Sequence, residues 1–295
     1  MSTISHTITC LGPMSHGDIG ADTGNVMRFR RIAHLSPAGV PVYIPAISAG
    51  ALRGVVRRIL WRDIFDRTGL SRETLPGQWD RLYAALANGG TIEAAEKRVS
   101  PDEIRARRAA LPVLSLLGAA LYTSHMAGRA RVSNSVLDCR ESAAAGLPVD
   151  GAAPMRDLLA DEARVRHVDR EEQDTEASGV GPMPTTVETV ISGARFVGHT
   201  HCAPSLEASA WAYGLDRVTH LGGKSAAGFG EVRVQHDGDA SEYAAWLDAN
   251  AETLRASLLA LAEALAKGKA KGKAKGKKAA PTPPPAQGAD SLALF

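Results

Sequence analysis

The sequence predicts an α+β protein whose core elements follow the order strand, helix, strand, strand, helix, strand. Apolar and polar residues alternate in 3–11 and again in 228–235, which is typical of half-buried strands. Apolar residues recur at helical spacing in 48–65, and the segment 185–202 is rich in β-branched residues. This order is that of a ferredoxin-like (RRM-like) βαββαβ palm, interrupted here by large insertions.

The first strand places His6 on the same face as its apolar residues, so that face should be buried. A Gly-rich polar segment follows, from position 12 to about 39. Ser48 is suited to cap the N-terminus of the helix 48–65. We expect the start of that helix to present backbone N–H groups to its surroundings, an arrangement that favours an anion.

The chain divides into a palm with two insertions, a C-terminal helix and a tail. The palm covers 1–240, with an inserted helical subdomain at about 71–127 and an excursion rich in charge, Gly and Pro at 140–186. We expect a helix at 241–266 and disorder in the low-complexity tail 267–295. The smaller palm elements are an extended piece at 40–45, a strand at 129–139, a strand or hairpin arm at 185–202 and a helix at 205–221.

Composition excludes several classes of protein. With 295 residues and 44% hydrophobic content, the chain can bury a large core. It has no apolar run of transmembrane length and no signal-peptide pattern, so we expect a cytoplasmic protein with no membrane partner. Cys10, Cys139 and Cys202 lack the spacing of a zinc finger or a disulfide framework. The tail carries seven lysines and one acid, so the rest of the chain is net negative and a polyanion must meet local basic clusters.

A glycine-rich loop runs from Gly222 to Gly230 and surrounds Lys224 and Ser225. A nucleotide-binding P-loop would need a glycine at Val218 and would join a strand to a following helix. This loop instead follows a predicted helix and precedes a predicted strand. The sequence therefore disfavours a kinase or an ATPase.

Four segments in this order resemble the RAMP superfamily of CRISPR-associated proteins: VYIPAISAGALRGVVRR, GRARVSNSVLDC, TTVETVISGARF and GGKSAAGFGEV. The resemblance covers about residues 3–236. It is greatest to the repeated backbone ("seven" family) subunit, which forms a filament along the guide RNA (crRNA). The segments HGDIGADTGN and VSNSVLDCRES are most similar to type IV, and type III comes next.

The resemblance implies that the turn 44–48 and the start of the following helix lie at the guide backbone. In the loop Gly222–Gly230, glycines would let backbone N–H groups approach a phosphate closely, with Lys224 as the neutralising charge. The alternative is a tight turn that merely needs glycine. The residues expected to bind RNA are Arg28, Arg30, Ser48, Arg53, Arg57, Arg129, Arg131, Arg164, Arg166, Met183, Gly222, Gly223, Lys224, Ser225 and Gly228.

In this family a thumb hairpin wedges into the guide RNA. Its expected position here is 160–192, with Arg164, Arg166 and Met183 at the tip or the arms, and a plain exposed loop is the alternative. Arg129 and Arg131 should share one strand face, because side chains alternate with period two. They would contact phosphates only if that face is the RNA side.

Type III members of the family cut target RNA with an aspartate of the first long loop and a divalent metal. Asp18 and Asp22 are the candidates here, and Asp22 is one residue short of the family position. A carboxylate in such a loop is more often a turn residue. Cys202 should face away from His199 and His201, so the three should not hold zinc. We expect binding without catalysis, with no cofactor and no metal.

The sequence thus predicts a crRNA-binding backbone subunit of a CRISPR effector ribonucleoprotein. Several copies would oligomerise along the guide and present it for pairing with target DNA or RNA, in defence against viruses or plasmids. The expected partners are crRNA, further copies of the chain, other effector subunits and a helicase. Two alternatives stay open: a metal-dependent endoribonuclease that uses Asp22 or Asp18, and a ferredoxin-like single-strand RNA-binding protein outside CRISPR.

Overall fold

The structure, a computed structural model, describes residues 2–17, 26–90, 99–121, 124–166, 183–203 and 206–273. A seven-stranded antiparallel sheet has the order β12-β1-β11-β8-β4-β3, and β7 pairs with β11 off this path. Its strands are β1 (Ser2–Cys10), β3 (Arg31–Leu35), β4 (Pro41–Ile47), β7 (Arg131–Val132), β8 (Ser135–Leu137), β11 (Arg195–Cys202) and β12 (Val232–His236). The chain is therefore a mixed α+β protein, as predicted.

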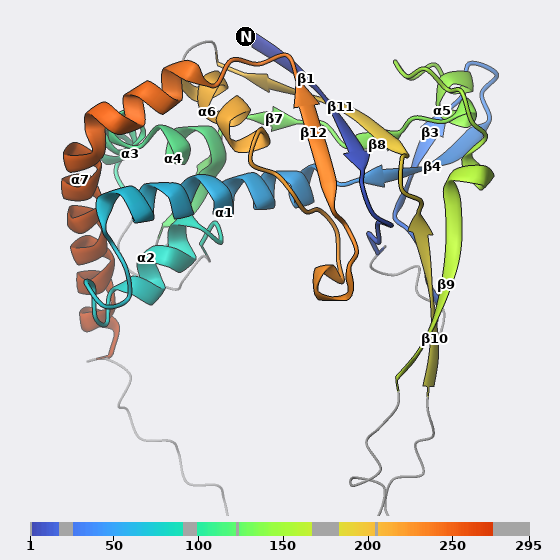
Figure 1. Cartoon of the computed structure of the whole chain (residues 1–295). Coiled ribbons are helices and arrows are strands. Elements are labelled where there is room, and N and C mark those ends of the chain that lie inside the picture. Colours follow the sequence, from blue (N-terminus) through green and yellow to red (C-terminus); the bar gives the residue numbers. More distant parts are fainter. Residues whose placement is uncertain are drawn as a thin grey trace, which may run out of the picture.

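Helices gather beside this sheet, and the hairpin formed by β9 (Leu159–Arg166) and β10 (Met183–Val190) projects away from it (Figure 1). Trp61, Trp211 and Tyr243 are fully buried among the helices. The helices are α1 (Ala49–Thr68), α2 (Trp79–Leu86), α3 (Pro101–Ala110), α4 (Pro112–Leu117), α5 (Arg140–Ala144), α6 (Leu206–Leu215) and α7 (Ser241–Lys273). Helix α7 packs against α1, α2 and α6 and closes the core at its outer side.

The two faces of the sheet differ in polarity because side chains alternate along β1 and β11. Ile8 and Phe196 are buried, whereas His199 and His201 lie on the more exposed face with their ring centroids 4.9 Å apart. Cys202 is fully buried, on the opposite face from these two histidines, as expected.

A second sheet forms the projecting hairpin. In it β9 (Leu159–Arg166) pairs antiparallel with β10 (Met183–Val190), and β2 (Val26–Met27) pairs in parallel with β10. The buried carboxylate of Glu188 accepts hydrogen bonds from the Phe29 amide at 2.8 Å and from the Arg31 guanidinium at 2.6 Å. These bonds fasten the base of the hairpin to the segment that leads into β3.

The region 71–127 is not helical throughout, contrary to the prediction. Helix α4 ends at Leu117, and β5 (Gly118–Leu121) and β6 (Ser124–Ala127) form a hairpin instead. Gly118 has φ +66°, and a Cβ there would lie 2.2 Å from the Met126 carbonyl oxygen. The apolar run in this region is thus divided by a backbone position that requires glycine.

The segment 185–202 is not one arm but parts of two strands in different sheets, β10 and β11. Gly193, with φ +86°, lies in the turn between them. The predicted strand 129–139 is likewise divided into the short strands β7 and β8. The run of β-branched residues does not indicate where these strands are interrupted, because each interruption is set by a turn and not by the residues of the strands.

The polar segment 12–39 contains β2 and β3, which gain hydrogen bonds from β10 and β4. Two predicted helix ends were wrong. Helix α6 ends at Leu215, before the predicted end at 221. Helix α7 continues to Lys273, seven residues into the expected disordered tail, because Ala and Lys favour a helix enough to tolerate glycines at about 1 kcal/mol each. Residues 274–295 lie outside the described residues.

Within the described residues, no helix combines the length and the apolar character needed to cross a bilayer.

His6 is a buried ionisable group between the sheet and the helices. It is 1% exposed, and its Nε2 lies 2.9 Å from the Ser135 hydroxyl. Burial, helped by the charges of His199 and His236 and opposed by Asp237, lowers the pKa of His6 from 6.5 to about 4. Between pH 6.5 and 4 the unfolded chain therefore binds a proton that the folded chain does not, so stability is lost as pH falls through this window.

We expect the free energy of unfolding of the wild type to fall by about 2 kcal/mol more than that of His6→Gln between pH 7 and pH 5. Glutamine can still bond the Ser135 hydroxyl but does not titrate. Urea unfolding of both proteins at the two pH values measures the difference. Equal losses in the two proteins would contradict the assignment to His6.

Candidate nucleic-acid interface

The candidate interface is organised by Pro13–Gly17, here called the bridging segment, which lies between two parts of the chain far apart in sequence. The Gly223 amide donates to the Ser15 carbonyl at 2.8 Å, and the Gly230 amide donates to the Pro13 carbonyl at 2.8 Å. Next in the chain, His16 Nε2 accepts a hydrogen bond from the Ser48 amide at 3.1 Å. The glycine loop (Gly222–Gly230) and the N-terminus of α1 are therefore both attached to this one segment.

The glycine loop owes its shape to positions that exclude a side chain. Gly222 has φ +87°, and a Cβ there would lie 2.3 Å from the Ser15 carbonyl oxygen. At Gly230, with φ +79°, a Cβ would lie 2.0 Å from the Leu221 carbonyl oxygen. Lys224, with φ +60°, has the one positive φ of a non-glycine residue in the part of the chain that is described. Gly222 therefore packs closely against the bridging segment, and Gly230 packs against Leu221, just before the loop.

Most glycine amides in the loop already have acceptors within the chain, which leaves few of them to bind a phosphate. Those of Gly223 and Gly230 donate to the bridging segment, and that of Gly228 donates to the Ser225 carbonyl at 3.0 Å. Lys224 is half-buried and Ser225 is exposed. Contact with a polyanion would therefore come from the tip of the loop around these two residues.

The N-terminus of α1 is also more satisfied than expected. The Ser48 hydroxyl accepts from the Ala51 amide at 3.2 Å, and the Asn134 side chain accepts from the Ala49 amide at 2.9 Å. Among the first three amides of the helix, that of Gly50 has no acceptor in the described ranges. The helix end still carries a partial positive charge, about half an elementary charge, towards the bridging segment.

Arginines accumulate beside the bridging segment. The Arg30 amide donates to the His16 carbonyl at 2.7 Å, which holds Arg30 against the site, and its side-chain Nε is buried without an acceptor among the described residues. Arg28 lies 3.7 Å from Glu188, which also binds Arg31. The single carboxylate of Glu188 thus faces Arg28 and Arg31, and together with Arg30 these arginines leave an excess of positive charge.

Arg53 and Arg57 do not join this group. Both guanidinium groups donate to the Leu117 carbonyl at the C-terminal end of α4, Arg57 at 2.7 Å. Within the described residues, no hydrogen bond connects either of them to the bridging segment or the glycine loop. The two arginines project from α1 towards the inserted subdomain.

Arg129 and Arg131 are not related as predicted. Strand β7 begins at Arg131, so the period-two alternation does not extend to Arg129. Arg129 lies 3.4 Å from Glu207 of α6, whereas Arg131 is exposed and pairs in register with His201. A charge already paired with a carboxylate contributes less to binding an anion than an unpaired one does.

On the hairpin, the backbone of Arg166 pairs with that of Met183, and Arg164 pairs with Thr185. These positions lie at the end of the hairpin farthest from the main sheet (Figure 1). Asp18 and Asp22, the candidate catalytic residues, lie outside the described residues.

Sequence reasoning missed His16, Asn134 and Glu188, which hold the site together. Each accepts a hydrogen bond from a backbone amide, and Glu188 also faces Arg28 and Arg31. A residue of this kind carries no spacing signal, because its partner is far away in the chain. No pattern in the sequence distinguishes it from a surface residue.

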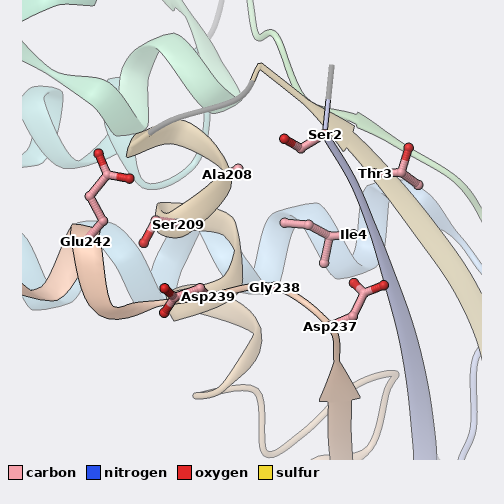
Figure 2. Close-up of a pocket in the computed structure, with 9 residues that line it drawn as sticks. All are labelled: Ser2, Thr3, Ile4, Ala208, Ser209, Asp237, Gly238, Asp239 and Glu242. Atoms are coloured by element: carbon pink, nitrogen blue, oxygen red, sulfur yellow. The ribbon is translucent and has the colours of Figure 1, made fainter.

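A separate hollow of about 280 Å³ lies between β1 and the start of α7, and Figure 2 shows the side chains around it. Asp237, Asp239 and Glu242 line this hollow. Asp237 accepts from the Ser5 amide and Asp239 accepts from the Ser241 amide, so two of the carboxylates serve local structure. Their charge would repel a phosphate, so this hollow is not part of the candidate interface.

The sequence matches no protein-family model and no curated protein. Among solved structures, a chain of a type IV-B CRISPR complex aligns with a TM-score of 0.54 and 22% identity over 80% of this chain and 90% of that chain. Csc2 of Thermofilum pendens aligns over 93% of this chain and 90% of that chain at 17% identity, but its TM-score of 0.39 is too low to establish a shared fold. The chain therefore shares the fold of a CRISPR complex subunit, in agreement with its resemblance to type IV.

Adjacent glycines test the contact between the glycine loop and the bridging segment. We expect Gly222→Ala to lower the free energy of unfolding by roughly 1–3 kcal/mol, because the new Cβ meets the Ser15 carbonyl at a positive φ. Gly223→Ala is the matched control, since its nearest contact would be 4.0 Å away. Denaturant unfolding measures both variants. Equal destabilisation of the two would argue against this packing.

Proposed function

We propose that this chain is a guide-RNA-binding backbone subunit of a CRISPR effector complex. The observation that carries the proposal is the bridging segment, which brings a glycine loop and a helix N-terminus together beside an excess of arginine. The fold shared with a chain of a type IV-B CRISPR complex supports the same assignment. Phosphate contacts of this kind position a strand without reading its sequence, so specificity would come from base pairing of the guide.

In this proposal the strands β12, β1, β11 and β8 form the ferredoxin-like palm. In chain order the four palm strands are β1, β8, β11 and β12. In the sheet β12 lies beside β1 and β11 lies beside β8, and α1 and α6 are the two crossover helices. The hairpin β9–β10 is inserted before β11 and would act as the thumb. The arginines of its outer end would then contact the guide.

Self-association along the guide has a candidate surface. The hairpin β3–β4 exposes Leu35 at 69%, Val40 at 58% and Tyr43 at 60%. Large apolar side chains that gather at one exposed hairpin favour a protein contact. We propose that this hairpin contacts the next copy, in an assembly that also includes other effector subunits.

Retention of guide RNA tests the function. When the chain is expressed together with a CRISPR array and then purified, it should retain array-derived RNA. If it retains only unspecific cellular RNA, a single-strand binder outside CRISPR would be favoured.

The role of Lys224 is tested by the salt dependence of this binding. Lys224→Asn keeps a residue that tolerates positive φ and removes the charge. It should weaken RNA binding and make the slope of log affinity against log salt shallower by about one. Arg62→Gln, an exposed position farther along α1, is the control and should leave the slope unchanged. Identical slopes for both variants would mean that Lys224 does not contact a phosphate.

We further propose that the subunit binds without cutting. An assembled complex incubated with complementary RNA and Mg²⁺ should leave the target intact. Regularly spaced cuts that disappear in Asp22→Ala would instead establish the ribonuclease.

A further inference from the structure

A second basic site lies along α1, away from the glycine loop. It is a pocket of about 360 Å³ between α1 and the hairpin β5–β6, here called the two-arginine pocket. Gly50, Arg53 and Arg57 line it from α1, Asn88 lines it from the turn after α2, and His125 lines it from β6. The first three recur at helical spacing, so one stripe of α1 faces the pocket.

The two arginines of this pocket carry charge that the described residues do not neutralise. Their guanidinium groups converge on one acceptor, the Leu117 carbonyl, and Arg57 also reaches the Gly118 carbonyl at 3.4 Å. Both Nε atoms are buried without a hydrogen-bond acceptor, and neither side chain forms an ion pair within the described ranges. Burial lowers the pKa of both arginines, and the charge of Arg53 lowers that of Arg57 further.

Capping of α4 does not account for this arrangement. The C-terminus of a helix carries about half a negative charge, and α4 has six residues, so two full positive charges exceed what it can balance. Charges withdrawn from water are ordinarily paired, because an unpaired buried charge costs several kcal/mol. Among the described residues, the pocket therefore has a surplus of positive charge and open space beside it.

The chemistry of the lining selects the kind of anion. Two guanidinium groups match the geometry of phosphoryl oxygens and donate charge-assisted hydrogen bonds to them. Asn88 and His125 line the same space and can donate further bonds. A phosphate monoester carries nearly two negative charges at neutral pH, which equals the charge of the arginine pair, whereas a phosphodiester carries one.

We propose that the two-arginine pocket binds a phosphate monoester, either a free mononucleotide or the 5′-phosphate at the end of a nucleic-acid strand. A volume of about 360 Å³ lies at the lower end of the range of ligand pockets and suits a group of this size. The proposal uses no residue of the glycine loop and does not depend on the proposed function.

Calorimetry on the full chain compares four probes: inorganic phosphate, adenosine monophosphate, a 5′-phosphorylated dinucleotide and the same dinucleotide with a 5′-hydroxyl. We expect the monoesters to bind at least about tenfold more tightly than the 5′-hydroxyl dinucleotide, whose one phosphate is a diester. If affinity rises from mononucleotide to phosphorylated dinucleotide, the ligand is a strand end; if it does not, the ligand is a free nucleotide. Equal affinity for monoester and diester, or binding of neither, would overturn the proposal.

Gly50 offers a variant that should fold normally. A Cβ there meets no atom within 4 Å, and an acidic residue is favourable in the first turn of a helix. Gly50→Glu places a carboxylate at the pocket and should bind phosphate at least about tenfold more weakly than Gly50→Gln, whose side chain has the same size but no charge. Equal affinity in the two variants would overturn the proposal.

Removal of an arginine gives a second comparison. Arg57→Gln should lower phosphate affinity at least about tenfold, and Arg58→Gln, the exposed neighbour with the same change of charge, should not. Thermal unfolding without phosphate separates loss of binding from loss of structure. A well-folded Arg57→Gln with unchanged affinity would also overturn the proposal.

Discussion

The attachment of two distant parts of the chain to Pro13–Gly17 is the constraint on which the candidate interface depends. Ser15 accepts from the glycine loop and His16 accepts from the amide of Ser48, so two adjacent residues set the relative position of loop and helix. Backbone atoms supply all but one of these donors and acceptors. Such a connection constrains the main chain closely while leaving side chains at the surface available for a ligand.

The same hydrogen bonds change how the glycine loop would act. Its glycines are needed for close approach to the protein's own backbone, and most of their amides are occupied. A polyanion would therefore be held by side-chain charge at the tip of the loop and beside it more than by a nest of amides. In the proposed function, salt-sensitive binding would then depend on Lys224, Arg28 and Arg30, and the helix dipole of α1 would contribute less.

The arginines discussed above fall into three groups according to their partners. Arg31 and Arg129 are paired with carboxylates and serve structure. Arg28 and Arg30 belong to a local excess near the bridging segment. Arg53 and Arg57 form a half-buried pair without a carboxylate among the described residues. The acidic hollow beside α7 adds a region that repels phosphate. The net charge of +2 conceals this division, because binding depends on local charge and not on the sum.

The sequence by itself determined the α+β class, the alternating strand β1, the capped helix α1 and the need for glycine near Lys224, because these depend on residues close together in the chain. It could not place the ends of β10 and β11 or the hairpin β5–β6, which depend on turns at Gly193 and Gly118. Tertiary structure alone decided that Arg53 and Arg57 face Leu117 and that His16 reaches Ser48. The physical reason is that a hydrogen bond between residues distant in sequence depends on how the elements pack. The residues next to either partner in the sequence do not indicate the other partner.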